Sequence, residues 1–328
     1  MTASAQPLAA TMRAIAFTAR ERAELIEVPR DASPLGANEV AGTTLVSLAS
    51  PGTELNAFIA ERTDRAICGY AAIFRVDAVG ANVADLRPGD LVFCMGNHAS
   101  QQRHARDSVV AVPAGLDPAV AVFCRLMGVS WSTLITTSAR PPAQVLVTGL
   151  GPVGNLAAQI FRAAGYRVSA VDPIAEWSAL ARELGIDAVE VLPREALKDR
   201  VDLALDCSGH EQAVLDAIDV VRRGGEAVLI GAPWRQRTDL SAHRLLHAIF
   251  HRYVRVRTGW EWEVPMQPQD FARGSIIANL AAALAWLRDG RVRVDGLAER
   301  VEAGDAQRAW LDLRHQRGAP TRIFTWSA

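Results

Sequence analysis

The sequence lacks the cysteine patterns that define several classes of protein. Four cysteines occur in 328 residues, and no two of them form a CxxC pair. Closely spaced cysteines of the kind that hold a structural zinc are therefore absent. Scattered cysteines that need no partner are typical of a chain with reduced thiols in the cytosol.

Charge of one sign and long apolar runs are also lacking. The formal net charge is −1 with 22% charged residues, so no electrostatic feature favours a nucleic-acid partner. Apolar runs are interrupted within a few residues, and none approaches the ~20 residues of a membrane span. Residues 1–11 have no basic start and no long apolar stretch, unlike a secretory signal. We therefore expect an unstructured leader, a cytoplasmic location and no membrane partner.

Half of the residues are apolar, and the length predicts two domains with a large core. Short alternating runs separated by Gly and Pro turns predict a small β-barrel-like domain at the start. These runs are residues 13–17, 23–28, 39–48, 73–79 and 91–93. An apolar helix is expected over residues 119–137, and a closing strand over 321–326 would fit a return to the first domain.

From residue 144 the pattern alternates between strands and helices, which predicts a parallel, doubly wound sheet. The expected strands are residues 145–148, 167–171, 201–206 and 227–230, and the expected helices are 153–164 and 176–184. Two further helices are expected at residues 275–287 and 306–314. The fold class is therefore α/β.

The sharpest motif is a GxGxxG sequence formed by Gly149, Gly151 and Gly154. It follows a predicted strand and opens a predicted helix, as in dinucleotide-binding folds. The first glycine permits a tight turn, the second admits the pyrophosphate, and the third allows close packing of helix on strand. With Pro152 and Val153, the N-terminus of the helix offers free N–H groups to the phosphates.

Asp172 ends the next predicted strand, where a carboxylate accepts hydrogen bonds from the adenosine ribose. It repels a 2′-phosphate, so we expect NAD rather than NADP as cofactor. Ser208, Gly209 and residues 231–233, with Gly231 first, follow later strands and are candidates to line the ribose and nicotinamide. Ordinary turn chemistry explains each of these residues equally well.

From Met12 onward the chain resembles the medium-chain dehydrogenase/reductase superfamily. The resemblance rests on the fingerprint with Asp172 and on several shorter motifs. These are Pro51-Gly-Thr-Glu54, Cys68-Gly-Tyr70, Arg87-Pro-Gly-Asp90 and the glycine-bearing segments 202–209 and 224–231. It implies a GroES-like β-barrel domain (residues 12–130 and 260–328) and a Rossmann dinucleotide-binding domain (131–259). A homodimer is expected from the family alone.

Zinc-dependent members of this family carry Cys-Gly-Thr-Asp, then Gly-His-Glu, then a third ligand on the helix that enters the Rossmann domain. Pro51 and Tyr70 stand at the first two ligand positions, and the third falls near Leu126, with Cys124 close by. Pro and Leu cannot ligate zinc. We expect no catalytic zinc, as in the zinc-lacking branch that contains bacteriochlorophyllide a dehydrogenase, which implies interconversion of secondary alcohols and ketones.

Without zinc, another group must stabilise the charge on the reacting oxygen and supply a proton. Tyr70 is the first candidate, because it stands at a ligand position; a packing tyrosine is the equal alternative. Thr53 matches a hydroxyl that relays protons in relatives, and turn residues are often Thr. Glu54 is expected to order the loop, and His98 is a candidate because histidine titrates near neutral pH.

The leading interpretation is thus a zinc-independent NAD(H)-dependent oxidoreductase acting on a small molecule. An NAD(P)H-dependent enoyl or quinone reductase is a second reading, which Asp172 disfavours. A non-catalytic nucleotide-binding protein is a third, because a fold does not establish a function. Trp260 and Trp262 suit a bulky or planar substrate, or equally the packing of one domain on the other.

Overall fold

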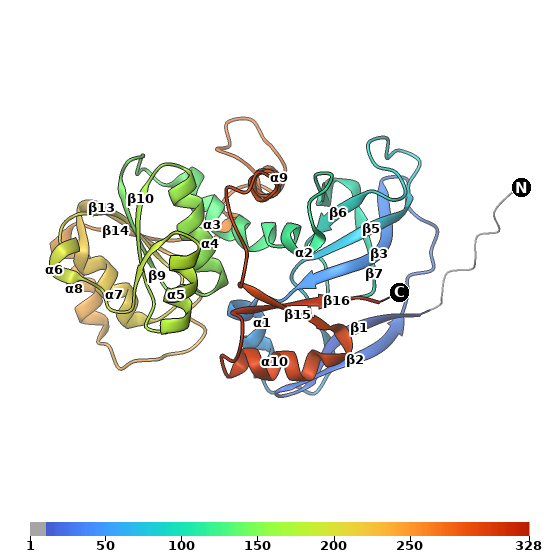
Figure 1. The fold of residues 1–328 in the computed structure, drawn as a ribbon, viewed down its shortest axis with the longest axis horizontal. Coiled ribbons are helices and arrows are strands. Elements are labelled where there is room, and N and C mark those ends of the chain that lie inside the picture. Colours follow the sequence, from blue (N-terminus) through green and yellow to red (C-terminus); the bar gives the residue numbers. More distant parts are fainter. Residues whose placement is uncertain (1–10, 328) are drawn as a thin grey trace, which may run out of the picture.

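The computed structural model describes residues 11–327, so the expected leader lies outside the described residues except for Thr11. Figure 1 shows two lobes side by side, with the chain passing from the first to the second and returning. The first lobe is built on two sheets and the second on one, and α3 (Cys124–Thr136) and α9 (Ile276–Arg288) lie between the lobes.

The second lobe is a six-stranded parallel sheet with the order β11-β10-β9-β12-β13-β14. This is the strand order of a doubly wound dinucleotide-binding sheet. The order of the strands reverses between β9 and β12, and in such sheets ligands bind at the carboxyl ends of the strands at this point. The strands are β9 (Gln144–Thr148), β10 (Arg167–Val171), β11 (Asp187–Val189), β12 (Val201–Asp206), β13 (Val221–Leu229) and β14 (Arg255–Thr258).

Helices cover both faces of this sheet, as a parallel sheet with buried faces requires. One apolar cluster joins α4 and α5 to one face, and another joins α7 and α8 to the opposite face. The helices are α4 (Pro152–Ala163), α5 (Ala175–Glu183), α6 (Arg194–Leu197), α7 (Glu211–Val220) and α8 (Ala242–Arg252).

The first lobe contains a three-stranded sheet, β2-β1-β4, and a seven-stranded sheet that is largely antiparallel. Its strands are β1 (Thr11–Ala19), β2 (Arg22–Pro29), β3 (Glu39–Leu48), β4 (Ala66–Ile67), β5 (Ala72–Val79), β6 (Leu91–Cys94), β7 (Gln101–Ala105), β8 (Val109–Ala111), β15 (Ala298–Glu302) and β16 (Thr321–Thr325). β16 pairs with β3, so the closing strand does return to the first lobe. The expected α/β fold with a GroES-like domain and a Rossmann domain is confirmed.

Short helices complete this lobe and the connections. They are α1 (Pro51–Phe58), α2 (Pro118–Ala121), α3 (Cys124–Thr136), α9 (Ile276–Arg288), α10 (Ala306–Arg314) and the 3₁₀ turns η1 (Arg106–Ser108), η2 (Glu261–Glu263) and η3 (Ala303–Asp305). The expected long helix at residues 119–137 is thus two helices. Asp117 caps the first by accepting the Ala119 N–H, and α3 starts after a short turn.

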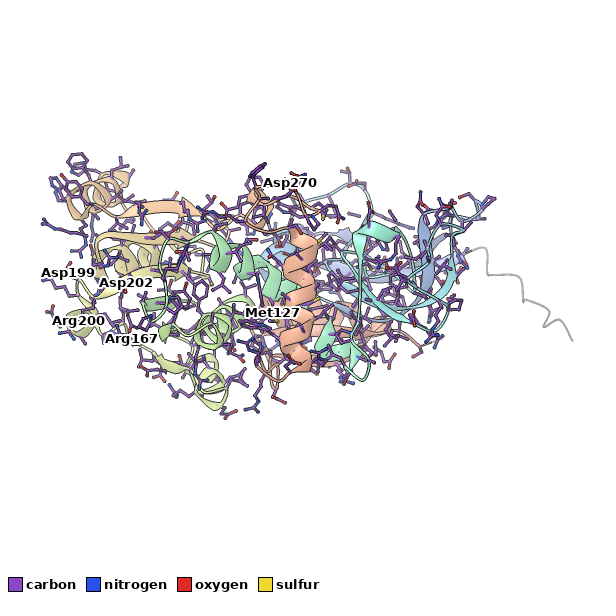
Figure 2. All side chains as sticks on the ribbon, turned by 90° about the horizontal axis from the view of Figure 1, so that it is seen from above. Met127, Arg167, Asp199, Arg200, Asp202 and Asp270 are labelled. Atoms are coloured by element: carbon purple, nitrogen blue, oxygen red, sulfur yellow. The ribbon has the colours of Figure 1, made fainter. Side chains whose placement is uncertain are left out.

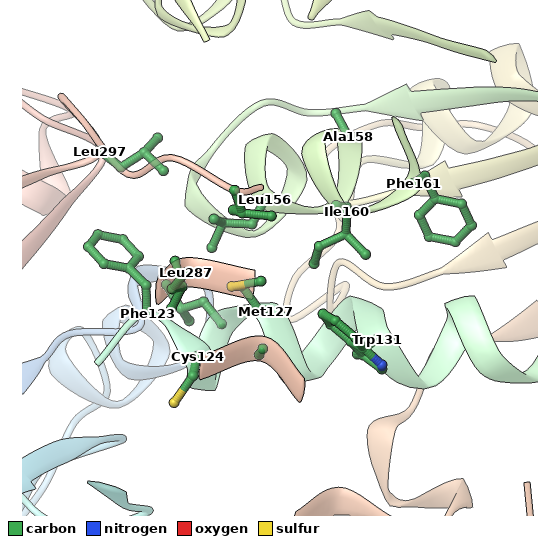
Figure 3. Close-up of a cluster of buried hydrophobic side chains, with 14 of the residues drawn as sticks. Phe123, Cys124, Met127, Trp131, Leu156, Ala158, Ile160, Phe161, Leu287 and Leu297 are labelled. Atoms are coloured by element: carbon green, nitrogen blue, oxygen red, sulfur yellow. The ribbon is translucent and has the colours of Figure 1, made fainter. Parts of the chain in front are cut away.

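Helix α3 is the centre of the main core. Its Met127 and Trp131 face Leu156 and Ile160 of α4 across a dry interface (Figure 3). On another side it packs against α9, which stands between the lobes near Met127 in Figure 2. Gly128 permits this approach, because a Cβ there would lie 3.2 Å from Leu280.

The stretch Pro118–Thr136 is apolar and long enough to cross a membrane by length and hydropathy. The expectation that no run approaches this length is therefore too strict, since Arg125 is the only charged residue in the stretch. In the fold, 72% of it is buried, as for the core helix of a globular lobe.

A second core lies under α1 and α10. Phe17, Phe58 and Trp310 pack with ring centroids 5.2 to 6.1 Å apart, and Phe324 joins them from β16. Through Phe58, this aromatic cluster anchors the C-terminal end of α1. The sequence patterns do not predict this helix.

Candidate active site

The glycine-rich turn lies between β9 and α4, at the carboxyl edge of the parallel sheet. Gly149 has φ +85°, which favours glycine. A Cβ on Gly154 would lie 1.8 Å from the Gly149 carbonyl oxygen, so only glycine allows this packing. A Cβ built on Gly151 would lie 3.5 Å from Trp177, in ordinary van der Waals contact. Gly149 and Gly154 thus have conformational and packing reasons to be glycine, whereas the predicted role of Gly151 in admitting a pyrophosphate stays a prediction.

Helix α4 begins at Pro152, followed by Val153, with its N-terminus at this turn. Proline suits the first position, because it has no N–H that would need a helical partner. The remaining free N–H groups and the positive end of the helix dipole suit a pyrophosphate.

Asp172 lies just after β10 and is 3% exposed. Its Oδ2 accepts the Leu150 N–H at 2.6 Å, and its Oδ1 accepts the Ile174 N–H at 2.8 Å. Burial raises the pKa of this carboxyl, and the two backbone N–H groups oppose that rise. Asp172 thus ties the glycine turn to the end of β10, and each oxygen keeps a further lone pair for a ribose hydroxyl.

Asp206 organises the next part of the edge, and the motif analysis does not single it out. Its Oδ1 accepts the hydroxyls of Thr148 and Ser208 at 2.8 and 2.6 Å, and its Oδ2 accepts the Gly209 N–H at 3.0 Å. Gly231 packs so closely against this turn that a Cβ would lie 2.3 Å from the Gly209 nitrogen. Ser208 and Gly231 therefore lie together at the sheet edge.

One contact joins this edge to the first lobe. Trp234, just beyond Gly231, donates its indole N–H to the Gly52 carbonyl oxygen at 2.6 Å. Gly52 lies in the first turn of α1, beside the exposed residue Thr53. The loop after β13 and the start of α1 therefore meet, which places Thr53 on the side of the nucleotide-binding lobe.

Glu54 and His98 form a buried pair behind α1. His98 is 0% exposed, and its Nε2 lies 3.2 Å from Glu54 Oε1. Glu54 Oε2 accepts the Ser50 N–H at 2.7 Å, which fixes the start of α1. Ser47 Oγ accepts the indole N–H of Trp326 and lies 2.8 Å from His98 Nδ1. If the Ser47 hydroxyl donates a hydrogen bond to Nδ1, the neutral His98 ring carries its proton on Nε2, the nitrogen that lies near Glu54.

Cys68 completes a group of three potential metal ligands, since ligand atoms of Glu54, Cys68 and His98 lie within 4.8 Å of one another. Its thiol donates to the Ile15 carbonyl oxygen at 3.4 Å. Burial, followed by the charge of Glu54, raises the pKa of this thiol well above its usual value. The cluster has the ligand types of a zinc site.

Tyr70 lies outside that cluster, on the side of α3. The guanidinium carbon of Arg125 is 4.2 Å from the centroid of the Tyr70 ring. Arg125 donates two hydrogen bonds of 2.6 Å to the carboxylate of Glu261, and both residues are buried. Burial raises the pKa of Tyr70, Arg125 opposes the rise, and a hydrogen bond from the Ser50 side chain also opposes it.

The resemblance predicts the zinc-ligand positions at Pro51, at Tyr70 and near Leu126. Pro51 begins α1, Tyr70 stands at the histidine position, and Leu126 is fully buried in the core. The neighbouring Arg125 brings a positive charge to this place. These residues do not fit a zinc ion, because none offers a usable ligand and a cation is already present.

The structure thus groups the candidate residues in three places. Gly149, Gly151, Pro152, Val153, Gly154, Asp172, Ser208 and Gly231 line the carboxyl edge of the parallel sheet. Thr53 follows Gly52, whose carbonyl oxygen accepts the Trp234 indole N–H, while Glu54 of α1 and His98 form a separate buried pair. Tyr70 lies on Arg125. The pairing of Arg125 with Glu261 carries no local sequence signal, because the two residues are 136 positions apart.

The substitution Gly151→Ala is expected to weaken nucleotide binding without changing the stability of the fold. The added Cβ meets no atom closer than 3.5 Å, so we expect stability within about 0.5 kcal/mol of wild type. The methyl group occupies the approach to the turn, so NADH affinity is expected to fall at least about tenfold. Titration of NADH fluorescence and urea unfolding measure the two effects.

The matched control is Gly304→Ala, where an added Cβ meets nothing within 4 Å. It is expected to leave NADH affinity unchanged. If Gly151→Ala binds NADH as tightly as wild type does, the pyrophosphate does not approach this turn.

Comparison with known proteins agrees with this geometry. Residues 152–260 match the family model of zinc-binding dehydrogenases. An alcohol dehydrogenase of Geobacillus stearothermophilus is 34% identical over 209 residues, which cover 51% of this chain and 61% of that protein. The chain spans about half the length of the curated relatives it matches.

Two solved structures match nearly the whole chain. Galactitol-1-phosphate dehydrogenase from Escherichia coli has a TM-score of 0.81 at 18% identity, covering 96% of this chain and all of the other. Acetophenone reductase from Geotrichum candidum, in complex with NAD, has a TM-score of 0.80 at 17% identity, covering 98% and 99%. The family model thus matches the nucleotide-binding lobe, and the solved structures match the fold of nearly the whole chain.

Proposed function

We propose that this chain is an NAD(H)-dependent oxidoreductase that interconverts a secondary alcohol and a ketone without a catalytic zinc. One observation carries the proposal: a phenol and a fixed guanidinium, Tyr70 and Arg125, are in contact where relatives hold the metal. The similarity to an alcohol dehydrogenase supports the reaction class.

The residues at the sheet edge suit a dinucleotide. The glycine turn and the start of α4 would hold the pyrophosphate, and Asp172 would accept the ribose hydroxyls. The carboxylate disfavours a 2′-phosphate, which supports NAD over NADP. Bound NADH supplies the hydride.

Tyr70 is the proposed catalytic acid in the direction of ketone reduction. Burial raises the pKa of its phenol, so the group carries its proton at neutral pH, where a donor is needed. Thr53, exposed beside Gly52, is suited to relay a proton between solvent and the site. Glu54 would fix the start of α1, and His98 Nε2 lies 3.2 Å from its other oxygen.

Trp260 and Trp262 are 66% and 46% exposed where the chain leaves the second lobe. Large exposed rings near η2 favour a bulky or planar substrate. The proposal keeps a GroES-like domain over residues 12–130 and 260–328, a nucleotide-binding domain over 131–259, a homodimer and a cytoplasmic location.

The first test is cofactor choice. Wild-type protein is expected to bind NADH more tightly than NADPH in fluorescence titrations, because Asp172 repels the 2′-phosphate. Asp172→Ser removes that repulsion and is expected to narrow or reverse the preference. Tighter NADPH binding by wild type would instead favour an enoyl or quinone reductase, and binding of neither nucleotide would remove the basis of the proposal.

Tyr70→Phe tests the catalytic acid. We expect the rate of ketone reduction to fall by roughly 10²- to 10⁴-fold, because one proton donor is lost. NADH affinity is expected to stay at the wild-type value. Tyr253→Phe is the matched control. Tyr253 is 70% exposed on the second lobe, so its substitution should change neither the rate nor the NADH affinity. A Tyr70→Phe protein with full turnover would assign the proton to another group.

Metal analysis and thermal unfolding with chelator test zinc independence. Purified protein is expected to hold far less than one zinc per chain, and a chelator is expected to leave Tm and turnover unchanged. Stoichiometric zinc, with a fall in Tm on chelation, would contradict the proposal. Loss of that zinc in Cys68→Ser would then place it in the cluster with Glu54 and His98.

A further inference from the structure

The pair formed by Arg125 and Glu261 joins the start of α3 to the segment that returns from the second lobe. The two side chains are 4% and 7% exposed, and two hydrogen bonds of 2.6 Å join them. Ser132 of α3 also donates to the Glu261 carbonyl oxygen at 3.3 Å. Residues 136 positions apart are thus held in one geometry.

Stability alone does not explain this pair. Desolvation of two charges often exceeds their mutual attraction, so apolar residues would serve a purely structural purpose as well. Arg125 also lies in the first turn of α3, where the helix dipole disfavours a cation. Its Nε is buried and has no hydrogen-bond partner among the described residues. A cation held in such an unfavourable place needs a further role.

The ring of Tyr70 supplies that role, because the guanidinium lies 4.2 Å from its centroid. Three charged groups face the phenol: Arg125 from α3, Glu261 from η2 and Glu54 from α1. Of these three charges only that of Arg125 is positive, so only it favours the phenolate over the neutral phenol.

We propose that Arg125 is a positioning residue that stabilises the phenolate form of Tyr70, and that Glu261 holds it over the ring. This inference rests on the proposed function for its catalytic meaning, but not for its electrostatics. The positive charge that a metal supplies in relatives would here come from a guanidinium that acts through the phenol.

The step balances in atoms and charge. In reduction, the carbonyl carbon takes a hydride from the reduced nicotinamide, which is oxidised, and the C=O π bond breaks. The Tyr70 O–H bond breaks as the alcohol O–H bond forms. The negative charge then lies on the Tyr70 oxygen, beside Arg125, until a proton from solvent restores the phenol.

Tyrosinate absorbance in the near ultraviolet reports this ionisation directly. The chain has three tyrosines, Tyr70, Tyr166 and Tyr253, so subtracting the titration of Tyr70→Phe isolates one group. The compared variants are Glu261→Gln and Arg125→Met/Glu261→Gln. They differ only in Arg125, and neither leaves a buried carboxylate without its cation.

The pKa of Tyr70 is expected to be about one unit or more higher in Arg125→Met/Glu261→Gln than in Glu261→Gln, a tenfold difference in phenolate at a given pH. Arg125→Lys/Glu261→Gln, which keeps the charge without the planar fork, is expected to recover part of the shift. In ketone reduction, the pH profile of kcat is expected to move in the same direction.

Equal titration of Tyr70 in wild type, in Glu261→Gln and in Arg125→Met/Glu261→Gln would overturn the inference. So would a phenol that stays protonated up to the pH of alkaline unfolding in both of the compared variants. A titration difference in a protein that reduces no ketone would keep the electrostatic role and reject the proposed function. Ketone reduction with no difference in titration would support the proposed function and reject the electrostatic role of Arg125.

Discussion

The structure depends on one buried helix that both lobes share. Helix α3 contributes to the core on the side of α4, and its Gly128 lets α9 pack closely against it. Arg125 at its start faces Tyr70 in the first lobe, and Ser132, about two turns later, meets the segment returning from the second. Because interiors are close-packed, the position of α3 sets the distance between the site residues of the two lobes.

The two sides of the site are held by different physical means. On the nucleotide side, backbone geometry dominates: glycines allow close approach, and Asp172 and Asp206 accept N–H and O–H groups that shape the turns. On the side of the first lobe, buried ionisable groups dominate, in the pairs Glu54 with His98 and Arg125 with Glu261. The first arrangement recognises a ligand common to many enzymes, and the second is where chemistry specific to this chain would arise.

The sequence predicts the parts of this arrangement whose partners are near in the chain. The fingerprint predicts the nucleotide-binding turn correctly because its strand, glycine turn and helix are adjacent in the sequence. The residues that contact one another therefore lie in one short segment. Helices at residues 306–314 and strands at 201–206 are predicted to the residue, since their apolar spacing is regular. Helix α1 is not predicted, because its eight residues begin with Pro and Gly and show little periodicity.

Contacts between distant residues account for what the sequence does not show. Arg125 and Glu261 each look like surface charges in a local window, and only the fold brings them together. His98 looks like a loop residue, although Phe324 and Trp310 enclose it, with ring centroids 4.9 and 6.2 Å away. Tyr70 could be singled out only because the resemblance marks its position, and the motif alone does not reveal the cation beside it.

Under the proposed function, the balance at Tyr70 explains how the reaction would proceed without a metal. A zinc ion acts on the reacting oxygen directly, whereas a phenol must first hold a proton and then release it. Burial favours the first requirement, since it keeps the phenol neutral, and it opposes the second. A cation over the ring favours release of the proton without exposing the site to water. A buried tyrosine without Arg125 would hold its proton too firmly, and an exposed one would lose the dry surroundings in which a fixed charge acts strongly.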